Sequence, residues 1–394
     1  MKLVLKNGQV FSGGELKNLN IGIDNGKIAE LSEGEISGSE EIDCTGKVIL
    51  PGLIDPHVHF RTPGLEHKED WATGSRAALH GGVTTVLDMP NTNPPTLSVE
   101  LLEEKRKIVG KDSLVNFGFH FGAAVDNIGE IKKVTNVASV KVFMNLSTGR
   151  MLISDRGKLG EIFGAAKQIA VHAEGSKVRL AMDLAKETGT KLYLCHISTA
   201  EELEMIADED VSVEATPHHL FLTEKDAVSP FFKMIPGLKS QKDQDKLWEA
   251  INSGRVNSIG TDHAPHTAEE KESEDPPAGV PGIETMLPLL LDSVNGGRLE
   301  LGKIVELCCE NPARIFGIKN KGFIEEGFDA DLAVVDLEKE WVVKGKELFT
   351  KCKWSPFDGK RLKGFVERTI VGGIVKFENG KIVSEERGEE IDFE

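Results

Sequence analysis

Histidines are the residues of this sequence whose spacing most directly suggests metal chemistry. His57 and His59 are separated by one residue in Asp55-Pro56-His57-Val58-His59-Phe60-Arg61. Residues i and i+2 of an extended segment point to the same side, so both imidazoles could bind one metal ion. The same pattern also fits two ordinary histidines of a strand, and the His-x-His motif alone leaves both interpretations open.

Three further candidate ligands favour the metal interpretation. His172, His196 and Asp262 each come shortly after a short run of apolar and β-branched residues that predicts a strand. Four histidines and one carboxylate suit a borderline ion such as Zn²⁺. Because a catalytic zinc takes about three protein ligands and a water, five ligands suggest two ions.

A lysine is the unusual member of this set. Lys141 lies within the strand-like run Ser139-Val140-Lys141-Val142-Phe143. Its position alone favours a lysine that faces solvent, because an ammonium beside two cations would be repelled. Addition of CO₂ would turn the amine into an anionic carbamate whose two oxygens could lie between two metal ions.

The middle of the chain predicts the elements that would position these residues. Strand and helix patterns alternate over residues 52–318, which favours a (β/α)₈ TIM barrel in the α/β class, with a doubly wound sheet as the alternative. In a barrel, the carboxyl ends of the strands meet at one mouth, where the candidate ligands would converge. The predicted strands are 84–87, 139–143, 169–171, 192–194, 211–213 and 256–259, and the predicted helices include 99–109, 177–187, 200–207 and 241–252.

Both ends of the chain have a different pattern. Asn7-Gly8, Asn25-Gly26 and Asn379-Gly380 each follow or separate short apolar runs, and Asn-Gly is a strong hairpin signal because both residues adopt positive φ. The two ends therefore predict one small β-sandwich domain, built from residues 1–51 and 319–394 around a barrel of residues 52–318.

Composition excludes several classes of function. The 394 residues carry a formal net charge of −17, which argues against a nucleic-acid binder and against docking on an anionic membrane. The sequence contains no run of 18 apolar residues, and its first residues lack a signal-peptide pattern. Five cysteines, of which Cys308 and Cys309 are adjacent, argue against a disulfide framework and favour a reducing, cytoplasmic location.

Longer motifs identify a family resemblance. The run Asp55-Pro56-His57-Val58-His59-Phe60-Arg61-Thr62-Pro63-Gly64 resembles the opening signature of the amidohydrolase superfamily in its dihydroorotase form. Thr261-Asp262-His263-Ala264-Pro265-His266-Thr267 resembles the second signature, and four shorter motifs lie between them in the family's order: Met89-Pro90-Asn91-Thr92, Val171-His172-Ala173-Glu174, Cys195-His196-Ile197-Ser198 and Pro217-His218-His219-Leu220. The resemblance covers essentially the whole chain.

The resemblance implies a role for each candidate ligand. His57 and His59 would bind the more buried of two zinc ions, and His172 and His196 would bind the second. Lys141 would be the carbamylated bridge, with CO₂ as its source. Asp262 would contact the first ion and act as general acid and base.

The resemblance also implies a substrate. The reaction would be the reversible cyclisation of N-carbamoyl-L-aspartate to (S)-dihydroorotate with release of water, the third step of pyrimidine biosynthesis. Arg61, Asn91 and His266 would hold the exocyclic carboxylate, and a guanidinium suits that task because it can donate two parallel hydrogen bonds. The backbone at Ala278 and Gly279 would bind the pyrimidine ring.

Two departures from the family pattern concern substrate contacts. Ile235 stands where related enzymes often carry Asn or Arg, so another group must supply that contact. Ser147 and Thr148 stand where some relatives carry a Thr-Phe pair, and we expect the loop of residues 145–154 to close over substrate. Cys195 is expected to be a small buried hydrophobe, and His218 and His219 to be structural.

Alternative functions remain compatible with the sequence. Another cyclic amidohydrolase, such as an allantoinase or a hydantoinase, would use the same metal centre, although Arg61 and His266 argue against it. A barrel without activity that scaffolds a partner would usually have lost ligands, and none of the six is missing. A homodimer and an association with another enzyme of the pathway both fit the sequence.

Overall fold

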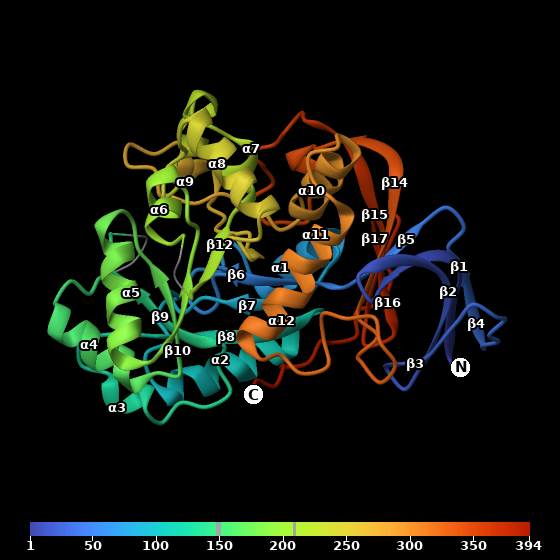
Figure 1. Ribbon diagram of the computed structural model, residues 1–394, viewed down its shortest axis with the longest axis horizontal. Coiled ribbons are helices and arrows are strands. Elements are labelled where there is room, and N and C mark those ends of the chain that lie inside the picture. The colour runs from blue at the N-terminus through green and yellow to red at the C-terminus, as the bar shows by residue number, and fades with distance from the viewer. Residues whose placement is uncertain (147–150, 208–209) are drawn as a thin grey trace.

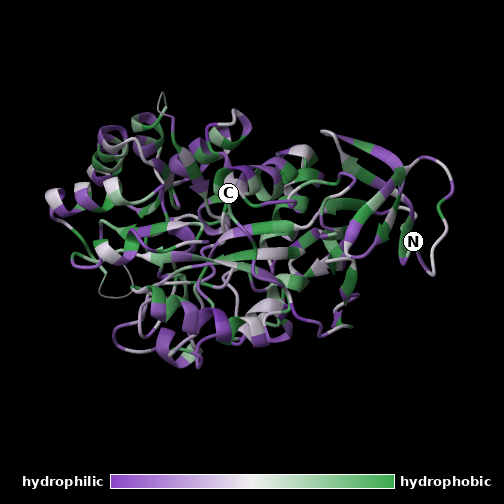
Figure 2. Ribbon diagram, turned by 90° about the horizontal axis from the view of Figure 1, so that it is seen from below, coloured by the Kyte–Doolittle hydropathy of each residue, from purple (hydrophilic) through white to green (hydrophobic). Residues whose placement is uncertain are grey.

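A helix-covered barrel and a β domain lie side by side in the computed structural model, which describes residues 1–146, 151–207 and 210–394 (Figure 1). The N-terminus lies in the β domain, and the C-terminus lies beside the barrel. Hydrophobic residues follow the central strands, whereas the surrounding helices carry most of the hydrophilic ones (Figure 2). The core is therefore centred on the strands.

The barrel contains eight parallel strands in the order β13-β12-β11-β10-β9-β8-β7-β6. His263, which follows β13, forms a parallel bridge with Val58 of β6 and nearly closes the ring. This confirms the predicted (β/α)₈ barrel. The strands are β6 (Leu53–Val58), β7 (Val83–Asp88), β8 (Asn116–Gly122), β9 (Ser139–Phe143), β10 (Gln168–His172), β11 (Lys191–Leu194), β12 (Ser212–Ala215) and β13 (Ser258–Ile259).

Helices follow most of these strands, as their sequence signals predict. Asp70, Ser98 and Ser240 cap three of them by accepting a backbone N–H in the first turn. No helix in the described ranges combines the length and the apolar character needed to cross a membrane. The helices are α1 (Trp71–His80), α2 (Val99–Asp112), α3 (Ile128–Ile131), α4 (Arg156–Ala165), α5 (Ser176–Thr188), α6 (Ala200–Met205), α7 (Pro217–Phe221), α8 (Gln241–Asn252), α9 (Ala268–Lys271), α10 (Met286–Asn295), α11 (Leu301–Val305) and α12 (Asn311–Phe316).

Two barrel strands, β6 and β8, are absent from the strands predicted above, although the His57-Val58-His59 motif at the end of β6 is expected to be extended. Strand β8 reads Asn-Phe-Gly-Phe-His-Phe-Gly, in which Phe117, Phe119 and Phe121 alternate with small or polar residues. Glycine lowers strand propensity, which hides the pattern. The structure explains Gly118, because a Cβ at this position would lie 2.7 Å from the Phe393 ring of the C-terminal tail.

The β domain takes strands from both ends of the chain, as predicted. Its nine strands form one mixed sheet, in the order β17-β16-β15-β14-β5-β1-β2-β3, with β4 also paired to β1. The Ala330 N–H donates to Gly26 O at 2.8 Å, which connects the segment before β14 to the turn between β2 and β3. The strands are β1 (Leu3–Ser12), β2 (Glu15–Asp24), β3 (Lys27–Ser32), β4 (Glu40–Asp43), β5 (Val48–Pro51), β14 (Leu332–Val342), β15 (Arg361–Val371), β16 (Ile374–Glu378) and β17 (Lys381–Ile382).

The Asn-Gly pairs have two different outcomes. Asn25-Gly26 and Asn379-Gly380 form the predicted two-residue turns, between β2 and β3 and between β16 and β17. The predicted hairpin at Asn7-Gly8 is wrong, because both residues lie inside β1 at a register shift. Strand β1 pairs with β4 before this point and with β5 after it, so the positive φ of Asn7 serves a bulge between two partners.

Candidate metal centre and substrate pocket

Two histidine rings converge on one carboxylate oxygen at the carboxyl ends of the barrel strands. His57 lies in β6, His59 follows that strand, and Asp262 follows β13. The Asp262 Oδ1 atom lies 2.9 Å from His59 Nε2 and 3.3 Å from His57 Nε2. The three side chains offer ligand atoms that all lie within 4.8 Å of one another. This is the geometry of a compact site for a cation.

Hydrogen bonds on the far side of each ring favour metal binding. His57 Nδ1 lies 2.9 Å from a Glu214 oxygen, and His59 Nδ1 lies 2.7 Å from Asn91 Oδ1. Both partners are acceptors, so each Nδ1 carries the proton and each Nε2 presents its lone pair towards Asp262. Lone pairs that face a carboxylate oxygen are repelled unless a cation or a proton lies between them. These three residues therefore fit a bound cation.

A second group of side chains comes from the neighbouring strands β9, β10 and β11. The ring nitrogens His172 Nδ1 and His196 Nε2 lie 2.9 Å apart. Among the described residues, the other nitrogens of these two rings are buried without a hydrogen-bond partner. Lys141 is fully buried beside them, and its Nζ lies 2.9 Å from Cys195 Sγ. Orphaned buried nitrogens are costly unless something binds them, so this group also fits a metal ion.

Charge and burial set the protonation states of the first group. Burial lowers the pKa of His57, but the Glu214 and Asp262 carboxylates outweigh it and raise that pKa to about 10. Burial acts in the opposite sense on Asp262, and the neighbouring His57 and His59 rings still hold its pKa well below the usual range. A cation at this point would replace the proton of His57.

The other three candidate histidine ligands, His59, His172 and His196, are neutral near pH 7. Burial lowers the pKa of His59 to about 4 and that of His172 to about 3, and it lowers the pKa of His196 well below its usual value. A neutral imidazole is the form that binds metals. The structure thus keeps three of the four candidate histidines in the ligand form without any metal present.

Three site residues adopt left-handed backbone conformations. The φ angles are 64° for Arg61, 40° for His196 and 47° for Asp262. Such angles are uncommon outside glycine, and they cluster at functional sites because the surrounding structure must hold them. Each of these residues follows a barrel strand, where the chain turns its side chain towards the mouth.

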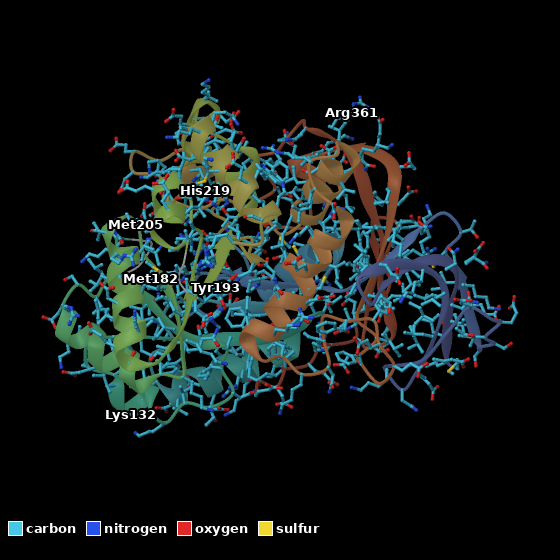
Figure 3. The ribbon with its side chains drawn as sticks, in the orientation of Figure 1. Lys132, Met182, Tyr193, Met205, His219 and Arg361 are labelled. Atoms are coloured by element: carbon cyan, nitrogen blue, oxygen red, sulfur yellow. The ribbon has the colours of Figure 1, made fainter. Side chains whose placement is uncertain are left out.

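Glu214 is a central residue that the sequence does not reveal. Its Oε1 accepts from His57 Nδ1 and from the His196 backbone N–H, both at 2.9 Å. Its Oε2 accepts from the hydroxyl of Tyr193 at 2.9 Å, and Tyr193 is buried among the barrel elements (Figure 3). A single glutamate in a short strand resembles a solvent-facing residue, so only the three-dimensional arrangement identifies it.

Replacing Glu214 by Gln is expected to weaken metal binding by about 10- to 100-fold, because the carboxylate fixes the orientation and tautomer of His57. Competition with a chelator measures the effect. Glu284→Gln is the matched control, since Glu284 is a buried carboxylate 2.8 Å from His80 Nδ1 and touches no candidate ligand. Equal metal affinity in Glu214→Gln and the wild type would remove this role.

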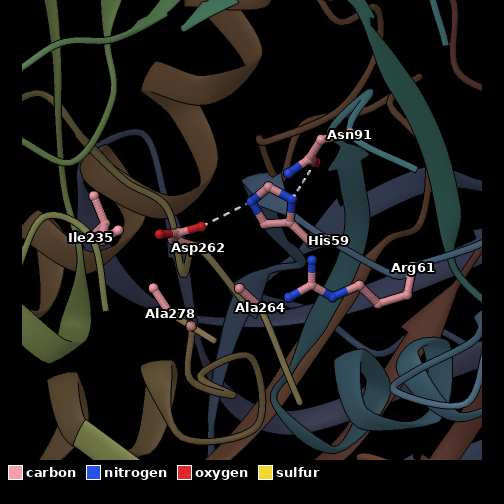
Figure 4. Close-up of a pocket in the computed structure, with 8 residues that line it drawn as sticks. His59, Arg61, Asn91, Ile235, Asp262, Ala264 and Ala278 are labelled. Carbon is pink, nitrogen blue, oxygen red and sulfur yellow. Dashed lines mark hydrogen bonds and ion pairs between the residues drawn. The ribbon is translucent and has the colours of Figure 1, made fainter. Parts of the chain in front are cut away.

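A small pocket, partly open to solvent, adjoins the first group (Figure 4). Arg61 and Asn91 lie on one side of it, and Ile235 and Ala278 lie on the other. Arg61 is buried, and its Nε donates to Pro265 O at 3.2 Å, which fixes the orientation of the guanidinium group. The residues that line the pocket are His59, Arg61, Asn91, Ile235, Asp262, Ala264, Ala278 and Gly279.

His266 lies behind this pocket and is not among its lining residues in the described part of the chain. Lys68 donates to His266 Nδ1 at 3.1 Å, so the Nε2–H is directed to Ala278 O at 3.0 Å. The same Nε2 lies 3.2 Å from Arg61 Nη2. In this arrangement the Nε2–H of His266 supports the Ala278 segment, and the ring stands beside Arg61 without accepting from it. The contact of His266 with the substrate carboxylate stays a prediction.

The other sequence predictions have simpler outcomes. Ile235 lines the pocket with an apolar side chain. Cys195 is buried, and His219 contacts Thr216 Oγ1 and Pro236 O. Ser147 and Thr148 lie outside the described residues, so the closure of the 145–154 loop stays a prediction.

Comparisons with known proteins agree with the geometry. A model described as the amidohydrolase family matches residues 48–383. The dihydroorotase of Pyrococcus abyssi (strain GE5 / Orsay) is 40% identical, with 99% of this chain and 98% of the relative covered. The dihydroorotase of Thermococcus kodakarensis is also 40% identical, with 100% and 98% covered.

Solved structures share the fold. The L-hydantoinase (dihydropyrimidinase) of Arthrobacter aurescens superposes with a TM-score of 0.94 at 31% identity, over 99% of each chain. A dihydropyrimidinase from Brevibacillus agri NCHU1002 has a TM-score of 0.90 at 24% identity, with 97% of this chain and 96% of that chain covered. The second similarity concerns the fold alone.

Proposed function

This chain belongs to the amidohydrolase family, and we propose that it is a dihydroorotase that interconverts N-carbamoyl-L-aspartate and (S)-dihydroorotate. The matches to the family and to dihydroorotases confirm the family resemblance found in the sequence. The observation that carries the substrate assignment is the buried guanidinium of Arg61, which shares one pocket with His59 and Asp262.

The charge of Arg61 explains why an anionic ring would bind. Burial lowers the pKa of Arg61 to about 10, so the guanidinium still carries its charge at pH 7. A buried charge without an ionic partner is unfavourable, and a substrate carboxylate would supply that partner through two hydrogen bonds. The net charge of −17 does not oppose this, because Arg61 and the two proposed metal ions would concentrate positive charge in one mouth.

Two Zn²⁺ ions fit the donor set described above. His57, His59 and Asp262 would hold one, His172 and His196 the other, and Lys141 would contribute to both as its carbamate. The carbamate forms when the neutral amine of Lys141 attacks CO₂, a C–N bond forms and the nitrogen loses a proton. When bound, the ions lower the pKa of a water molecule and polarise the carbonyl that is attacked.

The side chains of this protein then bind, orient and transfer protons. Arg61, Asn91 and His266 would hold the substrate carboxylate, and the backbone at Ala278 and Gly279, which line the pocket, would bind the ring. During hydrolysis, Asp262 takes the proton of the attacking water and delivers it to the ring nitrogen as the C–N bond breaks. During cyclisation, Asp262 removes the proton of the carbamoyl nitrogen and returns it to the oxygen that leaves as water.

A hydantoinase is the second candidate, because a hydantoinase structure superposes closely and Ile235 makes one side of the pocket apolar. A substrate panel separates the two. We expect kcat/KM for dihydroorotate to exceed those for dihydrouracil and hydantoin by at least about 100-fold, from a charge-assisted pair with Arg61. The variant Arg61→Met should lose this preference.

Arg76→Met is the control in this panel, because Arg76 lies on α1 and pairs with Glu385 away from the pocket. It should keep the wild-type preference. Turnover of hydantoin that equals or exceeds that of dihydroorotate would favour the second candidate. A protein that binds no metal and converts no member of the panel would instead indicate a scaffold.

A further inference from the structure

Lys271 is a buried lysine at the end of α9 that takes no part in the proposed reaction. The side chain is fully buried, and its ammonium donates to Lys233 O at 2.9 Å, Pro277 O at 3.0 Å and Gly279 O at 3.1 Å. The Trp354 ring lies 5.7 Å from Nζ. Among the described residues, no carboxylate forms an ion pair with this ammonium.

A buried ammonium of this kind destabilises the folded protein. An ammonium removed from water without an opposite charge is destabilised, and burial lowers the pKa of Lys271 to about 8. Its three N–H donors are nevertheless all used, one for each backbone carbonyl. The ammonium of Lys271 therefore fixes the positions of three carbonyl groups relative to one another.

The three carbonyls belong to the two segments that form the apolar side of the pocket. Lys233 lies two residues before Ile235, while Pro277 and Gly279 flank Ala278. Ile235, Ala278 and Gly279 all line the pocket. One buried charge thus connects both parts of this side from behind.

The segment around Gly279 has little room to move by itself. The Gly279 N–H donates to Lys233 O at 3.0 Å, which adds a direct bond between the two segments. Gly279 has a φ of 138°, and a Cβ there would collide with Ala264 O. Loss of the ammonium would leave the Pro277 and Gly279 carbonyls without this donor, and Lys233 O would keep only the Gly279 N–H. The mutual repulsion of the closely spaced carbonyl oxygens would separate the two segments.

We propose that Lys271 is a positioning residue for the substrate ring. Its ammonium holds the Ile235 and Ala278 segments at the spacing that the ring requires and thereby sets the affinity for substrate. The inference rests on the proposed function only in naming a cyclic amide as the ligand of this pocket. The chemical step itself does not involve Lys271, because Lys271 contacts none of the candidate metal ligands.

The test compares Lys271→Met with the wild-type metalloenzyme. Methionine keeps a similar shape and removes the three donors, so we expect KM for dihydroorotate to rise by about tenfold or more, with kcat and zinc content little changed. Lys271→Gln keeps one donor group and should have an intermediate KM. Lys376→Met is the matched control, because Lys376 is equally buried, donates to Leu114 O at 2.8 Å and lies in β16.

The control should lose thermal stability and keep its KM. An unchanged KM in metal-loaded Lys271→Met, or a lower kcat at constant KM, would overturn the proposal. If Lys271→Met does not fold, the KM of Lys271→Gln decides in the same way.

A second measurement is independent of the reaction. Amide hydrogen exchange of residues 277–283 should be faster in the variants than in the wild type, and unchanged exchange would overturn the proposal. If the wild type fails to convert dihydroorotate, the proposed function fails, and this exchange measurement still decides the role of Lys271.

Discussion

Replacing Asp262 by Asn is expected to reduce turnover by at least about 10²- to 10⁴-fold, the range attributed to a general acid and base, and to leave zinc content nearly intact. The amide keeps an oxygen at the point where the His57 and His59 nitrogens converge, but it cannot accept the proton. Asn tolerates the left-handed φ of 47° at this position, so the backbone should not change. Steady-state kinetics with metal analysis of the same sample measures both quantities.

Asp331→Asn is the control for this variant. Asp331 is also a buried aspartate, and it binds Lys321 and Asn116 outside the mouth of the barrel. It should keep turnover close to that of the wild type, apart from a loss of stability. Substantial residual turnover in Asp262→Asn would exclude Asp262 as the group that transfers the proton.

Replacing Lys141 by Ala is expected to remove both zinc ions and the activity. Lys141 is fully buried in β9, next to the strand that carries His172, and it pairs with Ala170 two positions before that histidine. An unmodified ammonium there would repel the cations, whereas a carbamate would neutralise part of their charge. The variant leaves a cavity of the size of the missing side chain.

Short carboxylic acids should enter that cavity and partly restore zinc binding and turnover in Lys141→Ala. Propionamide is the control, because it has the shape of propionate and lacks the charge, and it should not rescue. Full activity of Lys141→Ala without any added acid would contradict the carbamate. Equal rescue by the amide would show that volume, and not the negative charge, is what the site needs.

The candidate ligands can be picked out in the sequence for a physical reason. Parallel barrel strands are buried on both sides and are therefore apolar, so a histidine or an aspartate just after one is conspicuous. His172 ends β10, and Asp262 follows β13 by three residues. The structure brings these residues to one mouth because all eight strands run in the same direction.

Residues that act through others are harder to predict. Glu214 of β12 supports His57 of β6, a strand with which β12 does not pair, and its position in sequence gives no sign of this contact. Lys271 ends the run Ala-Glu-Glu-Lys, which resembles an exposed helix. His266 supports the Ala278 segment, a contact that its position in sequence does not predict, and its contact with substrate stays a prediction. Each of these depends on which loops pack together, and local pattern does not encode that.

Local signals also fail where a strand changes its partner. Asn7-Gly8 has the composition of a hairpin turn, but β1 continues through it because β4 and β5 provide successive neighbours. The sequence does not predict strand β8 for a related reason. Gly118 interrupts the strand pattern, and the close approach of Phe393 favours a glycine there. In both places a long-range contact outweighs the local preference.

The central claim is that this chain interconverts N-carbamoyl-L-aspartate and dihydroorotate with a two-zinc centre. The most direct measurement follows both directions of the reaction with purified chain whose bound zinc has been determined, before and after removal of metal by a chelator. We predict two zinc ions per chain and turnover in both directions, with activity lost on chelation and restored by zinc. A chain that carries two zinc ions and converts neither compound would contradict the claim.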